Sequence, residues 1–307
     1  MKAAYLEALG GPEVLQYGDQ PDPVCGPGQV VVDIHAATVN AADWQVRSGR
    51  YGNPVSTFPY ILGRDFSGVV SEVGDGADLA VGDEVFGVLD VGDEGAYAEK
   101  VVIKSSIIAK KPSSLTHIEA AAIALTGITA KITIEDTLKL QSGETILIQG
   151  GAGGVASVGI QIAKHIGAKV ITTASAHNHD YIRGLGADEI IDYNAVDFTT
   201  VLSDIDAVFD TAGGEVADRS FQVLRPGGRA AFIASGPTAP TPERSDVTGL
   251  RPAVGRDRPH LERVLEMHAA GAIKVPDVTL YSLSDVVEAH KVSEARHLKG
   301  KLVFKIR

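Results

Sequence analysis

The chain has very little cysteine and little positive charge. Its 307 residues include 1 Cys, and 28 Lys and Arg stand against 39 Asp and Glu, so the formal net charge is -11. A single cysteine excludes an internal disulfide and a cysteine-based metal cluster, as is typical of a reducing compartment. The acidic balance disfavours a nucleic-acid partner, because such binding relies on neutralisation of phosphates by Lys and Arg.

The chain also has no long apolar run. Residues 1–10, M-K-A-A-Y-L-E-A-L-G, contain no apolar core of signal-peptide length, and the most apolar stretch, 120–130, is too short to cross a bilayer. We therefore expect a cytoplasmic protein with no membrane partner. Hydrophobic residues make up 44% of the chain, with 34 Gly and 14 Pro, which is typical of an α/β protein with many turns. The length predicts two domains.

The middle of the chain has the pattern of a strand, a glycine turn, a helix and a second strand. Residues 145–149 form a short apolar run that leads into Gly150 and Gly151, and apolar residues then recur at spacings of three and four as far as Ile166. Gly167 follows as a helix terminator, and a second strand is expected at 169–173. This order is typical of a dinucleotide-binding βαβ unit.

The glycine turn itself matches a dinucleotide-binding fingerprint. Residues 151–156 read G-A-G-G-V-A and fit G-x-G-x-x-G/A, whose small residues let a pyrophosphate approach the bare backbone. The helix N-terminus would add free N–H groups and a partial positive charge. Such turns can be purely structural, but the flanking strands and helix favour cofactor binding. We predict cofactor contacts from Gly151, Ala152, Gly153, Gly154 and Val155.

The residues that end the second strand bear on the choice between NAD and NADP. NAD enzymes usually place an Asp or Glu there, about 20 residues after the motif, to bind the ribose 2′-hydroxyl. Residues 172–178 read T-T-A-S-A-H-N and carry no carboxylate. A carboxylate facing a 2′-phosphate would be a costly like-charge pair, so its absence favours NADP, although ordinary loop residues would look the same.

The rest of the chain divides into two kinds of pattern. Short β-like runs separated by turns fill residues 1–111 and indicate an antiparallel barrel or sandwich, with strands at 30–36, 66–73, 83–88 and 96–103. A capping box at Thr116 and Glu119 opens an alanine-rich helix, which we expect to stop near Gly127 before a second helix to about Leu140.

Regular β/α alternation then predicts a doubly wound parallel sheet. Further strands are expected at 189–191, 207–210 and 229–234, residues 236–258 are either a long loop or a weak strand, and residues 278–306 have a β-α-β pattern. We predict one domain formed by residues 1–113 and 272–307, and a second formed by residues 114–271.

Several segments together resemble the zinc-independent quinone oxidoreductase (zeta-crystallin-like) branch of the medium-chain dehydrogenase/reductase superfamily. They are V-N-A-A-D-W-Q-V-R-S-G (39–49), I-L-G-R-D-F-S-G-V-V (61–70), V-G-D-E-V-F-G (81–87), G-A-Y-A-E-K-V-V (95–102), A-A-I-A-L-T-G-I-T-A (121–130), G-G-A-G-G-V-A (150–156) and L-G-A-D-E-I-I-D-Y (185–193). The resemblance implies an α/β protein with a GroES-like β-rich catalytic domain and a Rossmann domain. It also implies a homodimer, and NADPH-dependent reduction of quinones or α,β-unsaturated carbonyls.

The resemblance also implies residues of the catalytic site. Asn40 and Asp43 are expected at the substrate and nicotinamide end, Tyr51 in the substrate pocket, and Thr126 beside the nicotinamide ribose. Alternatively, Asn40 and Asp43 organise a tight turn, Tyr51 is a packed aromatic, and Thr126 ends a helix. Gln45 stands where relatives have a tyrosine, so no tyrosine proton donor is expected there, and solvent could supply the proton.

On the cofactor side, the resemblance implies a pocket for the 2′-phosphate. Ser175, His177 and Tyr193 match positions that hold this phosphate in relatives, and Ala212 and Ile233 complete the predicted cofactor contacts. His177 replaces a more usual Lys or Arg, which predicts weaker and pH-sensitive NADPH binding because imidazole is mostly neutral at pH 7. Arg183 could compensate, or could be an ordinary solvated charge.

A catalytic zinc ion is not expected. Zinc needs Cys, His or carboxylate ligands at tetrahedral spacing, whereas the segments that hold zinc in other branches read Asn40-Ala41-Ala42-Asp43 and Gly63-Arg64-Asp65. Without a Lewis acid, catalysis relies on proximity and on hydrogen-bond donors near the developing negative charge. Quinones and enones suit this chemistry because they delocalise that charge. A low-turnover NADPH-binding protein and an NAD-dependent alcohol dehydrogenase are the alternatives.

Overall fold

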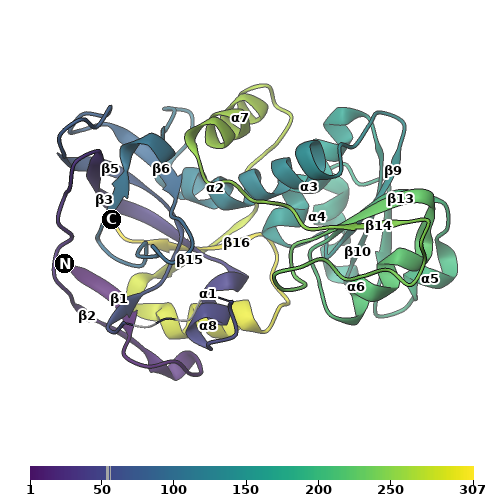
Figure 1. The fold of residues 1–307 in the computed structure, drawn as a ribbon, viewed down its shortest axis with the longest axis horizontal. Coiled ribbons are helices and arrows are strands. Elements are labelled where there is room, and N and C mark those ends of the chain that lie inside the picture. The colour runs from purple at the N-terminus through teal and green to yellow at the C-terminus, as the bar shows by residue number, and fades with distance from the viewer. Residues whose placement is uncertain (53–54, 56) are drawn as a thin grey trace. The chain divides into compact units, whose positions relative to one another are not determined.

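The protein is described by a computed structural model that covers residues 1–52, 55 and 57–307 (Figure 1). The chain forms two compact units. The first comprises Met1–Leu125, Arg256–Leu265 and Asp277–Arg307, and the second comprises Thr126–Gly255 and Glu266–Pro276. Each unit therefore draws on more than one part of the sequence, and the C-terminal residues belong to the first unit.

The first unit is rich in antiparallel strands. A three-stranded sheet has the order β2-β1-β4, and a seven-stranded sheet has the order β15-β16-β3-β5-β6-β8 with β7 paired to β3. Their bounds are β1 Lys2–Leu6, β2 Leu15–Asp19, β3 Gln29–Val39, β4 Tyr60–Ile61, β5 Asp65–Val73, β6 Glu84–Val88, β7 Lys100–Lys104, β8 Ala109–Lys110, β15 Val278–Ser282 and β16 Lys301–Lys305. Helices α1 (Ala41–Arg47) and α8 (Val286–Glu294) belong to the same unit.

The C-terminal strand completes the larger sheet of this unit. β16 runs antiparallel to β3, with Leu302 opposite Val39 and Phe304 opposite Ala37. Both strands are mostly apolar and their side chains are buried, so burial fixes this register. As a result, Lys301 reaches the chain at Val39 and Asn40, more than 250 residues earlier in the sequence.

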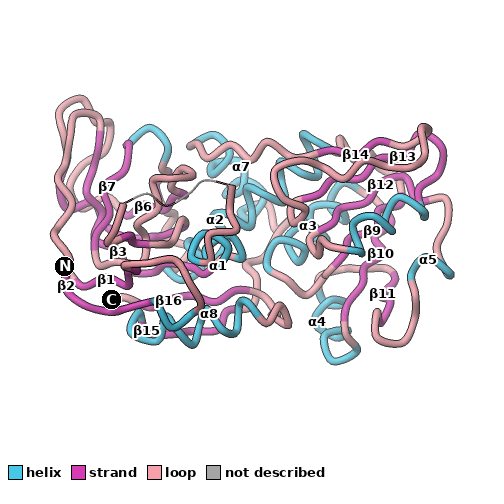
Figure 2. Tube along the Cα trace, turned by 60° about the horizontal axis from the view of Figure 1, so that its bottom comes forward, coloured by secondary structure: helices cyan, strands magenta, loops and turns pink. Residues whose placement is uncertain are grey.

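The second unit is built on a parallel sheet with the strand order β11-β10-β9-β12-β13-β14, as Figure 2 shows for the strands in magenta. The bounds are β9 Thr145–Gln149, β10 Lys169–Ala174, β11 Glu189–Asp192, β12 Ile205–Asp210, β13 Leu224–Phe232 and β14 Thr248–Leu250. Helices α3 (Gly154–Ile166), α4 (His179–Gly184), α5 (Phe198–Val201) and α6 (Glu215–Arg219) connect them. This order, which reverses direction at β9, is that of a Rossmann fold, so the predicted α/β fold class is confirmed.

One expected break in the chain is absent. Helix α2 (His117–Lys131) passes through Gly127 and continues as a π-helical segment, Ile132–Thr137, whereas we expected it to stop near that glycine. The capping box at its start is as predicted, because the Glu119 carboxylate accepts from the Thr116 backbone N–H at 2.8 Å. Every residue from 120 to 130 is buried, and this burial outweighs the cost of about 1 kcal/mol for a helical glycine.

The helical segment His117–Thr137 has the length and apolarity of a membrane span, yet 78% of its most apolar window is buried inside the protein. The core of a folded unit therefore accounts for its composition. Helix α7 (Arg258–Ala269) resembles α2 in one respect, since each begins in the first unit and ends in the second.

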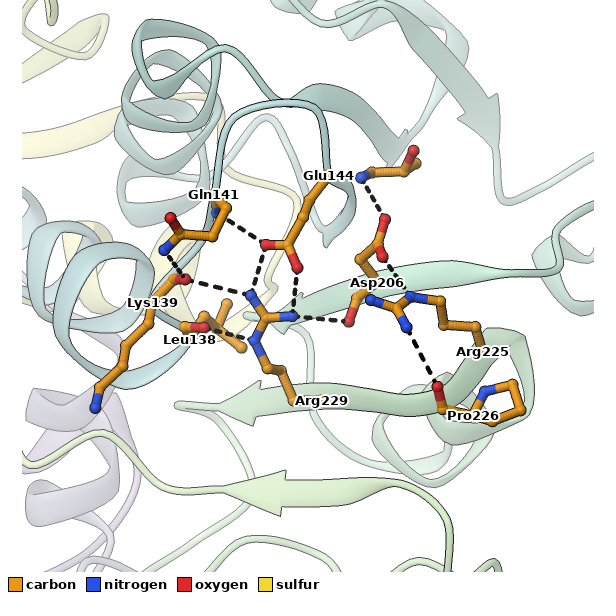
Figure 3. Close-up of polar contacts among 9 residues, drawn as sticks. Leu138, Lys139, Gln141, Glu144, Asp206, Arg225, Pro226 and Arg229 are labelled. Atoms are coloured by element: carbon orange, nitrogen blue, oxygen red, sulfur yellow. Dashed lines mark hydrogen bonds and ion pairs between the residues drawn. The ribbon is translucent and has the colours of Figure 1, made fainter.

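Ion pairs close the amino-terminal edge of the parallel sheet (Figure 3). The guanidinium of Arg229, on β13, donates to both carboxylate oxygens of Glu144 at 2.6 and 2.9 Å and also to the carbonyl of Leu138. Asp206, on β12, accepts from the Thr145 N–H at 2.8 Å and pairs with Arg225. These contacts join three strands and the end of the preceding helical segment.

Candidate cofactor and acceptor sites

The carboxyl edge of the parallel sheet begins with the glycine turn after β9. Gly150 has a φ of +76°, which favours glycine, and the Gly153 N–H donates to the Gly150 carbonyl at 3.0 Å to close the turn. A Cβ at Gly151 would lie 2.2 Å from Thr172 Oγ1, so only glycine fits against the neighbouring strand β10. The turn therefore presents mostly backbone at the start of α3, with no side chain larger than the Ala152 methyl group.

The first turn of α3 holds unpaired donors. The N–H groups of Gly154, Val155 and Ala156 donate no hydrogen bond to the described residues, and no side chain caps the helix. The first intrahelical bond comes from Ser157, whose N–H donates to the Gly153 carbonyl at 2.9 Å. Free amides at the positive end of a 13-residue helix suit an anion, and the bare turn beside them leaves room for a pyrophosphate. The residues present thus fit a dinucleotide.

The three residues predicted to hold a 2′-phosphate lie at neighbouring strand ends. Ser175 follows β10 and Tyr193 follows β11, and the last residues of these strands, Ala174 and Asp192, are register partners. Ser175 Oγ lies 3.4 Å from Nε2 of His177, and the Tyr193 side chain is 49% exposed. The fold therefore brings an hydroxyl, an imidazole and a phenol to one edge of the sheet.

Ala212 and Ile233 lie at the same edge, after β12 and β13. The Ala212 N–H donates to Asp210 Oδ1 at 2.8 Å, and the Ile233 N–H donates to the Asp210 carbonyl at 3.2 Å. Asp210 is register partner of both Gln149 on β9 and Phe232 on β13. All the predicted cofactor positions thus follow five strands that run in the same direction.

Thr126 belongs to the second unit, where it is 1% exposed on helix α2. It does not end that helix, because α2 continues for five more residues to Lys131. The alternative interpretation of Thr126 as a helix terminator is therefore wrong. Its predicted place beside the nicotinamide ribose stays a prediction.

In the first unit, Asn40 and Asp43 lie at the start of helix α1. The Asn40 backbone N–H donates to Asp43 Oδ2 at 2.8 Å, so the carboxylate caps its own helix. The Asn40 side chain also contacts two buried charged groups, Asp65 on strand β5 and Lys301 on strand β16. The two residues therefore organise the chain locally, as one alternative proposed, and Asn40 has a further set of contacts.

These contacts fix the orientation of the Asn40 amide. Lys301 Nζ donates to Asn40 Oδ1 at 2.5 Å, and Asn40 Nδ2 donates to Asp65 Oδ1 at 2.6 Å. An ammonium can only donate and a carboxylate can only accept, so the amide oxygen must face Lys301 and its nitrogen must face Asp65. One N–H of Asn40 is used in this way, and the second donates no hydrogen bond to the described residues.

Both charged partners of Asn40 are buried. Asp65 is 0% exposed and also accepts from Thr38 Oγ1 at 2.7 Å, while Lys301 is 3% exposed and also donates to the Val39 carbonyl at 2.9 Å. Burial lowers the pKa of Lys301, and the negative charges of Asp65 and Asp43 oppose that effect. Sequence reasoning missed Lys301, because nothing local in the C-terminal residues points to Asn40.

Asp43 is fully buried beside Tyr97. Its Oδ2 accepts from the Tyr97 hydroxyl at 2.7 Å, while its Oδ1 is buried without a hydrogen-bond partner among the described residues. Burial raises the pKa of Asp43 to about 6, although the charge of Arg64 lowers it. A carboxyl that is 0% exposed does not itself reach a ligand in this conformation.

Tyr51 lies against Arg64, which belongs to the segment Gly63-Arg64-Asp65. The Arg64 guanidinium stacks 4.6 Å from the centre of the Tyr51 ring and donates from Nη1 to its hydroxyl at 3.2 Å. Arg64 Nε also donates to Glu94 Oε1 at 3.1 Å, and Glu94 accepts from the Tyr60 hydroxyl. The 2% exposed Arg64 therefore joins Tyr51 to a buried carboxylate, and Tyr51 also packs against the hydrophobic core of this unit. Its place in the substrate pocket stays a prediction.

The sequence did hold a signal for Arg64 and Asp65, because they belong to one of the two segments from which we predicted that no catalytic zinc is bound. Among the described residues, no three His, Cys, Asp or Glu side chains are grouped so that they could hold a metal ion. The carboxylates of this region, Asp43, Asp65 and Glu94, each accept a hydrogen bond from a tyrosine, amide or arginine side chain.

Two family profiles match the chain. Residues 26–113 match the alcohol dehydrogenase GroES-like domain, and residues 185–304 match the zinc-binding dehydrogenase family. A curated relative, the chloroplastic NADPH-dependent alkenal/one oxidoreductase of Arabidopsis thaliana, is 31% identical over 317 residues, which cover 99% of this chain and 79% of the relative.

Solved structures are similar over almost their whole length. The quinone oxidoreductase from Coxiella burnetii has a TM-score of 0.91 and 31% identity, covering 100% of this chain and 99% of that one. The quinone oxidoreductase of Escherichia coli, crystallised in complex with NADPH, also has a TM-score of 0.91, with 27% identity and 100% coverage of both chains.

Proposed function

Because this chain belongs to the quinone oxidoreductase branch of the medium-chain dehydrogenase/reductase superfamily, we propose that it is an NADPH-dependent reductase of quinones or α,β-unsaturated carbonyls that uses no metal ion. The observation that carries the proposal is the first turn of α3, where three free amides adjoin a turn with no side chain larger than a methyl group. When bound, NADPH supplies a hydride, which with one proton from solvent converts a quinone to a hydroquinone or an enone to a saturated carbonyl compound.

The second unit would hold the cofactor through its backbone. Gly154, Val155 and Ala156 would donate their free N–H groups to the pyrophosphate, with Gly151, Ala152 and Gly153 in the turn beside it. Ser175, His177 and Tyr193 would donate to the 2′-phosphate. No Asp or Glu lies among residues 172–178, which supports NADPH over NADH because no like charge faces the phosphate.

The first unit would bind the acceptor through Asn40. Its second N–H would donate to the acceptor's carbonyl oxygen, where negative charge develops as the hydride arrives. Lys301 and Asp65 are positioning residues in this scheme, since they fix which end of the amide faces the ligand. Asp43 would also act by position, because it holds the Asn40 backbone and is itself fully buried.

Metal independence is supported by the residues that occupy the zinc-ligand positions of other branches. Asn40 and Arg64 stand in these segments, and Arg64 is a cation bound to Glu94. Neither an amide nitrogen committed to Asp65 nor a guanidinium is a zinc ligand. We therefore assign to hydrogen-bond donors the stabilisation of charge that zinc provides elsewhere.

The experiment is to follow NADPH oxidation with 1,4-benzoquinone, 9,10-phenanthrenequinone and a set of enones, with NADH and an exhaustively chelated sample in parallel. The proposal predicts turnover that prefers NADPH and is unchanged by chelation. Tight NADPH binding with no oxidation of any acceptor would favour the low-turnover alternative. Loss of activity on chelation, with recovery on adding zinc, would contradict metal independence.

Three further expectations belong to this proposal. We propose that residues 1–113 with 272–307 form the catalytic domain and that 114–271 form the cofactor domain. We also propose a cytoplasmic homodimer that binds neither nucleic acid nor membranes, in keeping with the net charge of -11. Sedimentation velocity tests the dimer, and gel shifts at physiological salt test the absence of nucleic-acid binding.

A further inference from the structure

Arg256 differs from Arg47, Arg64 and Arg258, which belong to the same unit. Its side chain lies largely out of solvent, and its Nε is buried without a hydrogen-bond partner among the described residues. By contrast, Arg47 binds Glu294, Arg64 binds Glu94, and Arg258 binds both carboxylate oxygens of Asp78 and two backbone carbonyls. A buried guanidinium donor without an acceptor is costly, so the position of Arg256 calls for a compensating ligand.

Arg256 shares its surroundings with Arg64 and Tyr51. The pKa of Arg256 is lowered, first by burial and then by the positive charge of Arg64, while Tyr51, Asp90 and Glu94 oppose this. The Arg64 guanidinium whose charge acts on Arg256 is the one that stacks on the Tyr51 ring, at 4.6 Å from its centre. Like charges in partly buried surroundings repel, and an anion close to both would relieve that repulsion.

The nearby carboxylates do not meet this need. Glu94 is already used by Arg64, by the Tyr60 hydroxyl and by the Gly92 N–H. Asp90 makes no ion pair with Arg256 within the described part of the chain, and Asp43 is fully buried against Tyr97. Arg64 also has a buried Nη2 that makes no hydrogen bond of good geometry, although it lies 3.0 Å from Glu94 Oε1 as an ion pair.

We propose that Arg256, with Arg64 and Tyr51, is a receptor for a carboxylate carried by the acceptor, so that the preferred substrates are enones or quinones with an acidic substituent. This inference rests on the proposed function and deepens it. A carboxylate matches the planar fork of a guanidinium, and its negative charge suits Arg256, whose buried Nε has no hydrogen-bond partner among the described residues. The carboxylate is a spectator: hydride and proton add elsewhere on the acceptor, and the acid group leaves unchanged.

Direct binding tests the receptor without catalysis. The probes are levulinate, a saturated keto acid that cannot accept hydride at a double bond, and its methyl ester, titrated calorimetrically into the full-length protein. We expect levulinate to bind at least tenfold more tightly than the ester. The substitution Arg256→Met should remove that difference, whereas Arg50→Met, which removes an exposed positive charge of the same unit, should leave it intact.

Turnover tests the consequence for specificity. The paired acceptors are 4-oxopent-2-enoate and its methyl ester, with the ratio of their kcat/KM values as the readout. We expect the acid to be preferred by the wild-type protein and Arg256→Met to lower the ratio at least tenfold through the KM of the acid. Arg256→Lys should recover part of the ratio, because it keeps the charge but loses the fork.

The binding and turnover experiments distinguish an error in the carboxylate receptor from an error in the proposed reductase function. If neutral enones and quinones are reduced but the acid has no advantage in binding or turnover, the receptor is wrong and the reductase stands. The receptor is also wrong if Arg256→Met weakens NADPH binding and leaves levulinate binding unchanged, since the anion would then be a cofactor phosphate. If levulinate binding depends on Arg256 but no acceptor is reduced, the reductase is wrong and the carboxylate site stands.

Discussion

The two candidate sites of this protein differ in which groups form them: one consists mainly of backbone and the other of side chains. The cofactor edge of the second unit is mostly backbone, a glycine turn and free amides that follow one another within six residues, 151–156. The candidate acceptor site of the first unit is made of side chains from distant parts of the chain, the half-buried Asn40 and the buried Asp65, Arg64 and Lys301. A backbone site tolerates few side chains, whereas a side-chain site depends on each partner being present.

The largest expected effect is on NADPH affinity and comes from adding a side chain to the glycine turn. We expect Gly151→Val to lower NADPH affinity by roughly a hundredfold or more, because even a Cβ at this position would lie 2.2 Å from Thr172 Oγ1 and the turn must shift. Gly184→Ala is the control, since a Cβ there meets no atom within 4 Å. Fluorescence titration with NADPH measures both. Wild-type affinity in the valine variant would place the cofactor elsewhere.

The acceptor site should respond instead to the loss of one side chain. We expect Lys301→Met to lower kcat by roughly 10- to 100-fold, because the Asn40 amide loses the partner that orients its oxygen. NADPH affinity should stay within about twofold of wild type. The control Lys305→Met removes an exposed lysine from the same strand. Equal losses of NADPH affinity and of kcat in the Lys301 variant would indicate general damage, and would contradict a positioning role.

The amino-terminal edge of the parallel sheet offers a third case, because we expect its charged side chains to contribute to stability and not to ligand binding. We expect Arg229→Met to lower the free energy of unfolding by roughly 2–4 kcal/mol, since it leaves Glu144 partly buried without its cation. Lys169→Met, which breaks the exposed pair with Glu189, should cost less than about 1 kcal/mol. Urea unfolding measures both. Similar losses in the two variants would contradict a stabilising role for the Arg229–Glu144 ion pair.

The Arg229–Glu144 ion pair should also make the stability of the protein depend on pH. Burial raises the pKa of Glu144, but the bonds from Arg229 and from the Gln141 N–H outweigh it, and the net pKa lies below the ordinary 4.5. A lowered pKa gives stability that is present above the unfolded value and is lost as pH falls through the folded value. Below about pH 4.5, the stabilities of wild type and Arg229→Met should therefore converge.

The smallest expected effect concerns the choice of cofactor. Ser175→Asp should shift the ratio of kcat/KM from NADPH towards NADH by about tenfold, since a carboxylate would then face the 2′-phosphate. Parallel initial rates with the two cofactors measure the ratio. An unchanged ratio would place the 2′-phosphate away from Ser175, His177 and Tyr193.

The difference between the two sites also explains how far the sequence could predict them. The Rossmann unit was predictable because strand, turn and helix signals around Gly151 are local, and α3 ends at Ile166, directly before the predicted terminator Gly167. Asn40, Asp43 and Tyr51 came only from resemblance to a family. The partners that give them chemical meaning, Lys301 and Arg64, depend on which strands pair.

Predictions from neighbouring residues in the sequence failed where contacts between distant parts of the chain determine the structure. Gly127 looked like a helix end, but the burial of residues 120–130 carries α2 through it. Nothing in the sequence singled out Lys301, yet the register of β16 on β3 brings it to Asn40. Arg256 lies in the segment 236–258 that gave no clear pattern, and nothing near it in the sequence indicates that its Nε is buried without an acceptor.

The central claim is that NADPH lies against the free amides at the start of α3, and amide hydrogen exchange tests it most directly. Exchange is measured at Gly154, Val155 and Ala156 in the folded protein with and without saturating NADPH. We predict that these amides, which donate no hydrogen bond to the described residues, become strongly protected when NADPH binds. If NADPH binds and their exchange rates do not change, the claim is wrong.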